Sequence, residues 1–167
     1  EMTLNLVQQL YEQKLTTYPR VDTTFLPDDV YGKCPQTMNG LFQVKFAGQS
    51  PYAELVRPLG GKPLLKSKKV FDSSKVTDHH AIIPTGIVPQ NLTDLQRKVY
   101  DLIARRCIAV FYPDCKFAQT TVLGEVRAAA TESQPTEQTV EFKVTGRTIL
   151  DAGWRAVYAK DTQTDDE

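Results

Sequence analysis

The sequence lacks several features that would assign it to a class from composition alone. No apolar run approaches the roughly 18 residues that a membrane-spanning helix needs, and no signal peptide is visible at the amino terminus. The three cysteines, Cys34, Cys107 and Cys115, do not have the C-x-x-C spacing of a metal site. These absences predict reduced thiols, no membrane partner and a cytoplasmic location.

Net charge gives no argument for a nucleic-acid partner, because 20 basic residues balance 20 acidic ones. The basic residues are nevertheless clustered, and the densest stretch runs from Arg57 to Lys75 with the single acid Asp72. Such a stretch is read either as a solvated loop or as a contact for a phosphate backbone. The candidate phosphate contacts are Arg57, Lys66, Lys68 and Lys69.

The first part of the chain has the periodicity of helices. Apolar residues at 3.6-residue spacing predict a helix over residues 3–15, and Thr93 with Gln96 forms a capping box for a second helix over 94–111. The expected apolar face of that second helix is Leu95, Val99, Leu102, Ile103 and Val110.

The region between these helices has weaker signals. Pro27 followed by two aspartates predicts a helix start, and a short helix is expected between Ser50 and Pro58. Residues 32–48 contain Gly and Pro and are interpreted mostly as loop, and residues 58–90 as a long, partly ordered connection.

After residue 113 the spacing of apolar residues changes from the helical period to a period of two, as in a strand. Val140, Phe142 and Val144 alternate with polar residues, which predicts a half-buried strand. Residues 117–127 and 154–159 are also β-like, with a polar turn over 128–137. The predicted class is therefore α+β: a mainly helical domain over 1–113 and a short antiparallel β segment over 114–160. An acidic tail over 161–167 is expected to be disordered.

One tyrosine has neighbours that suit phosphate chemistry. Tyr18 precedes a proline, so its backbone is expected to be extended, and residues two apart then face the same way. Tyr18 and Arg20 are therefore expected to project together. A phenolate can attack phosphorus, and a guanidinium can bind the phosphate oxygens. Because the chain has seven tyrosines, most of which should be packing residues, this chemistry alone does not single out Tyr18.

Both histidines of the chain, His79 and His80, lie in the segment Thr77–Thr85. Adjacent side chains point in different directions, so the pair is not expected to bind one metal ion. A histidine near a scissile phosphate could donate a hydrogen bond or carry a proton. The alternative is a structural pair.

Together and in this order, these two segments resemble the active-site motifs of type IA DNA topoisomerases. The version of the tyrosine motif with a proline before the arginine resembles that of the topoisomerase III subgroup. The segment Gly146–Trp154 resembles the stretch in which that family's chain returns to its β-rich arch. The match is spread over nearly the whole chain and is carried by residues 8–18, 78–85, 95–113 and 146–158. The resemblance implies a helical tyrosine domain followed by the returning arm of the arch.

The resemblance implies a role for each matching position. Tyr18 would attack a DNA phosphate and keep the 5′ end as a phosphotyrosine, Arg20 would stabilise that phosphate, and His79 would contact it. Asp22, His80 and Thr85 are expected to support the site, and Asp22 is expected to pair with Arg20 or to orient it. One departure is that Thr23 and Thr24 stand where many topoisomerase III sequences carry a second arginine, which puts one cationic DNA contact in doubt.

The same resemblance implies partners outside this sequence. In the family, an acidic cluster on an N-terminal domain holds magnesium, and no segment here matches it. We therefore expect this chain to bind no metal by itself and to need that domain for activity. The complete enzyme is expected to act on single-stranded DNA without ATP, in the cytoplasm near the nucleoid. Two alternatives are a non-catalytic module that binds single-stranded nucleic acid, with Tyr18 stacking on a base, and a protein-interaction domain that pairs through its β edge.

Overall fold

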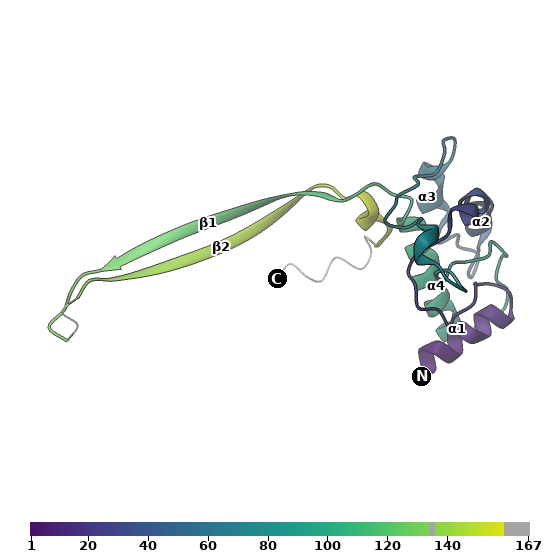
Figure 1. Cartoon of the computed structure of the whole chain (residues 1–167), viewed down its shortest axis with the longest axis horizontal. Helices are drawn as coiled ribbons and strands as arrows, with labels where there is room; N and C mark the ends of the chain where they lie inside the picture. The colour runs from purple at the N-terminus through teal and green to yellow at the C-terminus, as the bar shows by residue number, and fades with distance from the viewer. Residues whose placement is uncertain (134–135, 159–167) are drawn as a thin grey trace. The chain divides into compact units, whose positions relative to one another are not determined.

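The computed structural model describes residues 1–133 and 136–158, and it contains both helices and an antiparallel pair of strands (Figure 1). The chain divides into two compact units. The helical unit comprises residues 1–113 and the described residues from Trp154 onward, and the ribbon comprises residues 114–153. The predicted α+β class is confirmed.

The helical unit is built from short elements joined by irregular segments. Its α-helices are α1 (Met2–Glu12), α2 (Cys34–Gln43), α3 (Ala53–Val56) and α4 (Asp94–Ala109). Its 3-10 turns are η1 (Asp28–Lys33), η2 (Arg57–Leu59) and η3 (Ser73–Lys75), and a further turn, η4 (Gly153–Tyr158), follows the ribbon. Within the described part of the chain, no helix is long and apolar enough to cross a membrane.

Helix α4 starts where the sequence predicts. The Thr93 hydroxyl accepts a hydrogen bond from the Gln96 backbone N–H at 3.2 Å, and the Gln96 side-chain oxygen accepts one from the Thr93 N–H at 3.0 Å. This reciprocal pair satisfies two N–H groups that the first turn leaves without helical partners. The Gln96 amide also donates to the Gln9 side chain at 2.9 Å, which ties α4 to α1.

The apolar face predicted for α4 is partly wrong. Leu95 and Leu102 are 51% and 64% exposed. The side that packs into the core instead carries Tyr100, Ala104, Cys107, Ile108 and Ala109, all buried. That side combines small residues and a cysteine with Tyr100 and Ile108, so a count of large aliphatic residues alone cannot detect it.

Two further predictions are corrected. Residues 34–43, expected as loop, form α2, because Pro35 stands in the first turn, where a helix tolerates it. Gly40 is not a helix breaker there, since it gives the space for Gly86 to pack against the helix. Residues 154–158, expected as strand, form the 3-10 turn η4. That turn is held by the Trp154 N–H donating to Pro113 O and by Arg105 donating to Val157 O.

The ribbon consists of β1 (Lys116–Ala128) and β2 (Gln138–Asp151), paired antiparallel. The strands predicted over 117–127 and around Phe142 are confirmed. The predicted half-burial is wrong, because every residue of both strands is exposed. The acidic tail predicted over 161–167 lies outside the described residues.

Candidate functional site

The C-terminal end of α1 directs the chain into the Tyr18 segment. The Leu15 N–H donates to Leu10 O at 2.9 Å and the Lys14 N–H donates to Tyr11 O at 2.8 Å, while Lys14 has a positive φ of 62°. This is the Schellman pattern of a helix end, completed by two buried leucines, Leu10 and Leu15. The cap fixes the direction in which the following residues leave the helix.

Those residues pair with the histidine segment. The Thr17 N–H donates to Ile83 O at 2.9 Å and the Thr85 N–H donates to Leu15 O at 3.0 Å, with an antiparallel bridge between Thr16 and Pro84. The Thr17 hydroxyl accepts from the Ile83 N–H at 3.0 Å and donates to Ala81 O at 3.3 Å. Two segments more than 60 residues apart in the sequence are thereby held side by side.

This pairing brings Tyr18 and His79 together. Their ring centroids are 4.4 Å apart with an angle of 37° between the planes, so His79 lies over the ring of the tyrosine. On another side, Tyr11 of α1 meets Tyr18 in a T-shaped contact, with centroids 5.3 Å apart and planes at 82°. Tyr18 is half-buried and His79 is exposed. Within residues 1–133 and 136–158, the Tyr18 hydroxyl makes no hydrogen bond.

Arg20 and Asp22 are both exposed and lie just beyond this contact along the chain. In the described structure they share no ion pair, and neither makes a hydrogen bond to Tyr18 or His79. The predicted pairing of Asp22 with Arg20 is therefore not seen. The Arg20 guanidinium has no protein partner among the described residues.

Lys75 ends the basic stretch but is not among its four candidate phosphate contacts, and it lines a hollow together with Asp22. A hollow of about 310 Å³ is lined by Asp22, Thr23, Thr24, Phe25, Lys75 and Thr77. The Lys75 ammonium lies 4.4 Å from the centroid of the Phe25 ring, and the Thr23 hydroxyl donates to Lys75 O at 2.8 Å. A positive charge therefore stands near Thr23 and Thr24, and it comes from a different segment of the chain.

Two supporting residues hold the backbone of the site. A ring nitrogen of the half-buried His80, Nδ1, lies 2.8 Å from Ala81 O. The Thr85 hydroxyl donates to Lys14 O at 2.6 Å and accepts from the Ile87 N–H at 3.3 Å. The bond from Thr85 to Lys14 joins the histidine segment to the residues that follow α1, and the His80 contact lies within that segment.

Ion pairs are formed by Lys66 and Arg57, two of the basic residues predicted to contact phosphate. Lys66 pairs with Asp28 at 2.6 Å, and this hydrogen bond lowers the pKa of Asp28. Arg57 pairs with Glu54 at 2.8 Å, and Lys68 and Lys69 are exposed. Exposed ion pairs contribute little to stability, so Lys66 and Arg57 can exchange a carboxylate for a phosphate at small cost.

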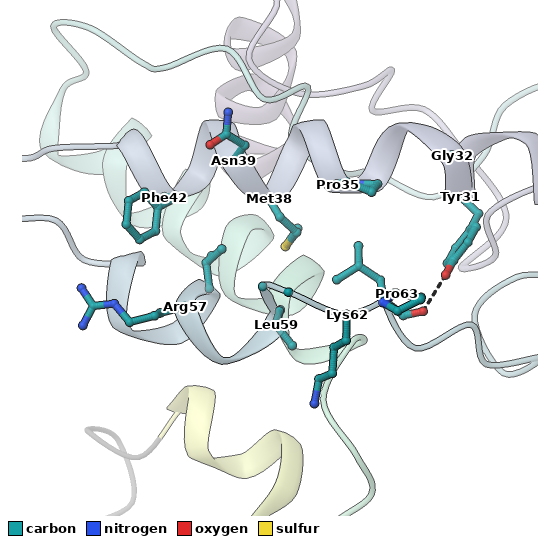
Figure 2. Close-up of a pocket in the computed structure, with 14 residues that line it drawn as sticks. Tyr31, Gly32, Pro35, Met38, Asn39, Phe42, Arg57, Leu59, Lys62 and Pro63 are labelled. Atoms are coloured by element: carbon teal, nitrogen blue, oxygen red, sulfur yellow. Dashed lines mark hydrogen bonds between the residues drawn. The ribbon is translucent and has the colours of Figure 1, made fainter.

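A further hollow of the helical unit is separate from the tyrosine site. A cavity of about 610 Å³ lies between α2 and residues 56–64, lined by apolar side chains such as Met38, Phe42 and Leu59 (Figure 2). Tyr31 closes one end by donating a hydrogen bond to Leu64 O at 2.6 Å. Of the predicted site residues, only Arg57 lines this cavity.

The described residues also bear on the magnesium ion that the resemblance implies. Among residues 1–133 and 136–158, no group of three or more His, Cys, Asp or Glu side chains is arranged to hold a metal ion. The donor set of this part of the chain therefore does not fit the ion.

Comparison with known proteins gives one consistent result. A family model described as DNA topoisomerase matches residues 1–167. Proteins named DNA topoisomerase 3 from Bacillus anthracis and Bacillus subtilis (strain 168) are 39% and 36% identical to the chain, over 98% and 99% of its length. The matched region is 21% of each relative, so the chain spans about a fifth of the length of these proteins.

Proposed function

Because the chain belongs to the DNA topoisomerase family, with relatives named DNA topoisomerase 3, we propose that it carries the nucleophile of a type IA enzyme and that this nucleophile is Tyr18. The observation that supports this most directly is the hydrogen-bonded pairing of residues 15–17 with 81–85, which sets His79 over the Tyr18 ring. Two motifs that the resemblance assigns to one active site thus meet in space.

In the proposed reaction the Tyr18 hydroxyl oxygen attacks the phosphorus of a single-stranded DNA phosphodiester. A bond forms from Tyr18 Oη to phosphorus, and the bond from phosphorus to the 3′ oxygen breaks. The phenol gives up its proton and the leaving 3′ oxygen takes one, so the products are a 5′-phosphotyrosine and a free 3′ hydroxyl. Because the ester conserves the bond energy, the reverse reaction reseals the strand without ATP.

The free guanidinium of Arg20 is suited to bind the non-bridging oxygens, whose charge grows in the transition state. His79 contacts the face of the tyrosine ring and not its hydroxyl, so we assign it to holding the ring and contacting the incoming phosphate. Lys75, Lys68 and Lys69 offer further positive charge for the DNA backbone.

Complete strand passage is proposed for the full-length protein and not for these residues alone. The described part of the chain offers no metal site, and the relatives are about five times longer. We propose that a magnesium-binding domain of the same protein completes the active site, that this chain alone does not relax supercoiled DNA, and that the enzyme works in the cytoplasm at the nucleoid.

The deciding experiment is covalent trapping with the full-length protein that contains this segment. The protein is mixed with magnesium and an internally labelled single-stranded oligonucleotide, quenched with denaturant, and digested for mass mapping. We expect the label on the peptide that contains Tyr18 and no label in Tyr18→Phe. Tyr31→Phe is the matched control, because it also removes one partly buried tyrosine hydroxyl, and it should retain the adduct. An adduct at another residue would reject the assignment.

The contact between two aromatic rings also supports a second candidate, a module that binds single-stranded nucleic acid without cutting it. A stacked ring pair such as Tyr18 and His79 can take up a base. In this case Tyr18→Phe would keep its affinity for the oligonucleotide and wild type would give no adduct, whereas the nucleophile hypothesis requires the adduct.

A further inference from the structure

We infer that Tyr11 is a positioning residue that holds the Tyr18 ring in its reactive orientation; this inference rests on the function proposed above. The starting point is the T-shaped contact between the two rings, with centroids 5.3 Å apart and planes at 82°.

The orientation of the Tyr18 side chain depends on its ring neighbours. The backbone beside it is fixed, because Thr17 bonds to Ile83 through both its N–H and its hydroxyl. The phenol hydroxyl has no hydrogen-bond partner in the described part of the chain, so no polar contact sets the side-chain torsions. The ring contacts that remain are with His79 on one side and Tyr11 on another.

Tyr11 is itself firmly placed. It stands in the last turn of α1, and its carbonyl oxygen accepts a hydrogen bond from the Lys14 N–H at 2.8 Å. The Lys14 carbonyl oxygen in turn accepts from the Thr85 hydroxyl at 2.6 Å. The helix end, the Tyr18 segment and the histidine segment therefore form one hydrogen-bonded unit, and Tyr11 approaches Tyr18 from a fixed position in it.

The exposure of Tyr11 distinguishes a positioning role from a role in core packing. Tyr11 is 39% exposed, whereas the neighbouring Leu10 is fully buried. A tyrosine so exposed contributes little to the core, and the ring contact recorded for Tyr11 is with Tyr18. His79 is exposed as well, so it could yield to an incoming DNA strand while Tyr11 keeps the ring in place.

The size of the expected effect follows from side-chain rotamers. A tyrosine without neighbours samples about three staggered wells of χ1, with further freedom at χ2, so releasing Tyr18 should dilute its reactive orientation about 3- to 10-fold. That dilution lowers the rate of cleavage after DNA has bound. Affinity for DNA should stay within about twofold, because Tyr11 is not proposed to touch the substrate.

The test uses the full-length protein and measures two quantities for each variant: single-turnover formation of the covalent adduct and Kd for the same oligonucleotide. Tyr11→Ala should slow adduct formation about 3- to 10-fold with Kd unchanged, and Tyr11→Phe should restore the wild-type rate because the ring remains. Phe42→Ala is the matched control, since Phe42 is another aromatic residue with 39% exposure and lies on α2, away from this contact. It should leave both quantities unchanged.

The outcomes separate this inference from the proposed function. If Tyr18→Phe abolishes the adduct and Tyr11→Ala forms it at the wild-type rate, the positioning role is wrong and the nucleophile stands. If Tyr11→Ala loses affinity for DNA and keeps its single-turnover rate at saturation, Tyr11 is a DNA contact, which also overturns the inference. If Tyr18→Phe still forms the adduct, both the nucleophile assignment and the positioning role are rejected.

Discussion

The helical unit and the ribbon keep their structure by different means. Every buried hydrophobic side chain among the described residues lies in the helical unit, from Val7 to Phe111 and at Val157. In the ribbon every strand residue is exposed, so its order comes from the antiparallel hydrogen-bond ladder and from pairs of side chains across the strands.

The ribbon nevertheless has the sequence of a strand pair with one covered face. Its register places Val122 opposite Val144 and Val126 opposite Val140, with Phe142 between them on the same face. These side chains are 46% to 66% exposed. Two strands without a packed face are marginal in water. The alternation of apolar and polar residues therefore identifies the strand face suited to burial, but it does not identify the partner that covers this face.

The largest predicted difference between the units is in the response to truncated side chains. Ile108→Ala removes a fully buried side chain of α4 and should lower the free energy of unfolding by about 2–5 kcal/mol. Val144→Ala removes a side chain that is 66% exposed and should change it by less than about 0.5 kcal/mol. Urea unfolding followed by fluorescence of the single tryptophan, Trp154, measures both in this chain. Equal effects would mean that the ribbon face is covered in solution.

The elements that sequence could predict are those with local signals. The capping box at Thr93 and the alternation around Phe142 each depend on a few neighbouring residues, and both are confirmed. Local signals do not predict helix α2, because glycine and proline usually break helices, whereas Gly40 accommodates Gly86, a residue far along the chain. A tertiary contact of this kind leaves no local pattern.

The candidate site shows the same limit. The Tyr18 and histidine motifs were each recognisable, but their pairing through Thr17 and Ile83 spans 66 residues and has no sequence signature. In the sequence, Tyr11 is one residue of a predicted helix and Lys75 is the end of a basic stretch. Their places beside Tyr18 and Asp22 follow from the fold, so composition and spacing could not supply them.

Thiol reactivity gives a second way to compare the units. Cys34 is buried in the helical unit, and burial raises its pKa to about 11. Burial also raises the pKa of Cys107. At pH 8, Cys34 should therefore react with iodoacetamide on the order of 100-fold more slowly than in the unfolded chain, where a thiol pKa is about 8.5.

Cys115, in the ribbon unit and partly exposed, should be alkylated first. Because the thiolate is the reactive form, the rate at Cys34 should rise about tenfold per pH unit below pH 11 while the fold persists. Peptide mass mapping over time measures each site separately. Rapid labelling of Cys34 at pH 8 would show that the helical unit opens more readily than its packing implies.

The smallest of the three expected effects concerns one glycine in each unit. A Cβ at Gly40 of α2 would lie 2.6 Å from the Gly86 backbone Cα and C, and closer still to its carbonyl oxygen, whereas a Cβ at Gly146 of β2 meets nothing within 4 Å. Alanine is normally favoured over glycine inside a helix by about 1 kcal/mol. Here the clash with backbone outweighs that gain, so Gly40→Ala should destabilise the chain by about 1–3 kcal/mol. Gly146→Ala should be neutral or slightly stabilising, since a strand glycine carries an entropic cost. Thermal unfolding of the two variants measures whether each substitution raises or lowers stability. A stabilising Gly40→Ala would mean that Gly86, and with it the segment that carries His79, does not pack against α2.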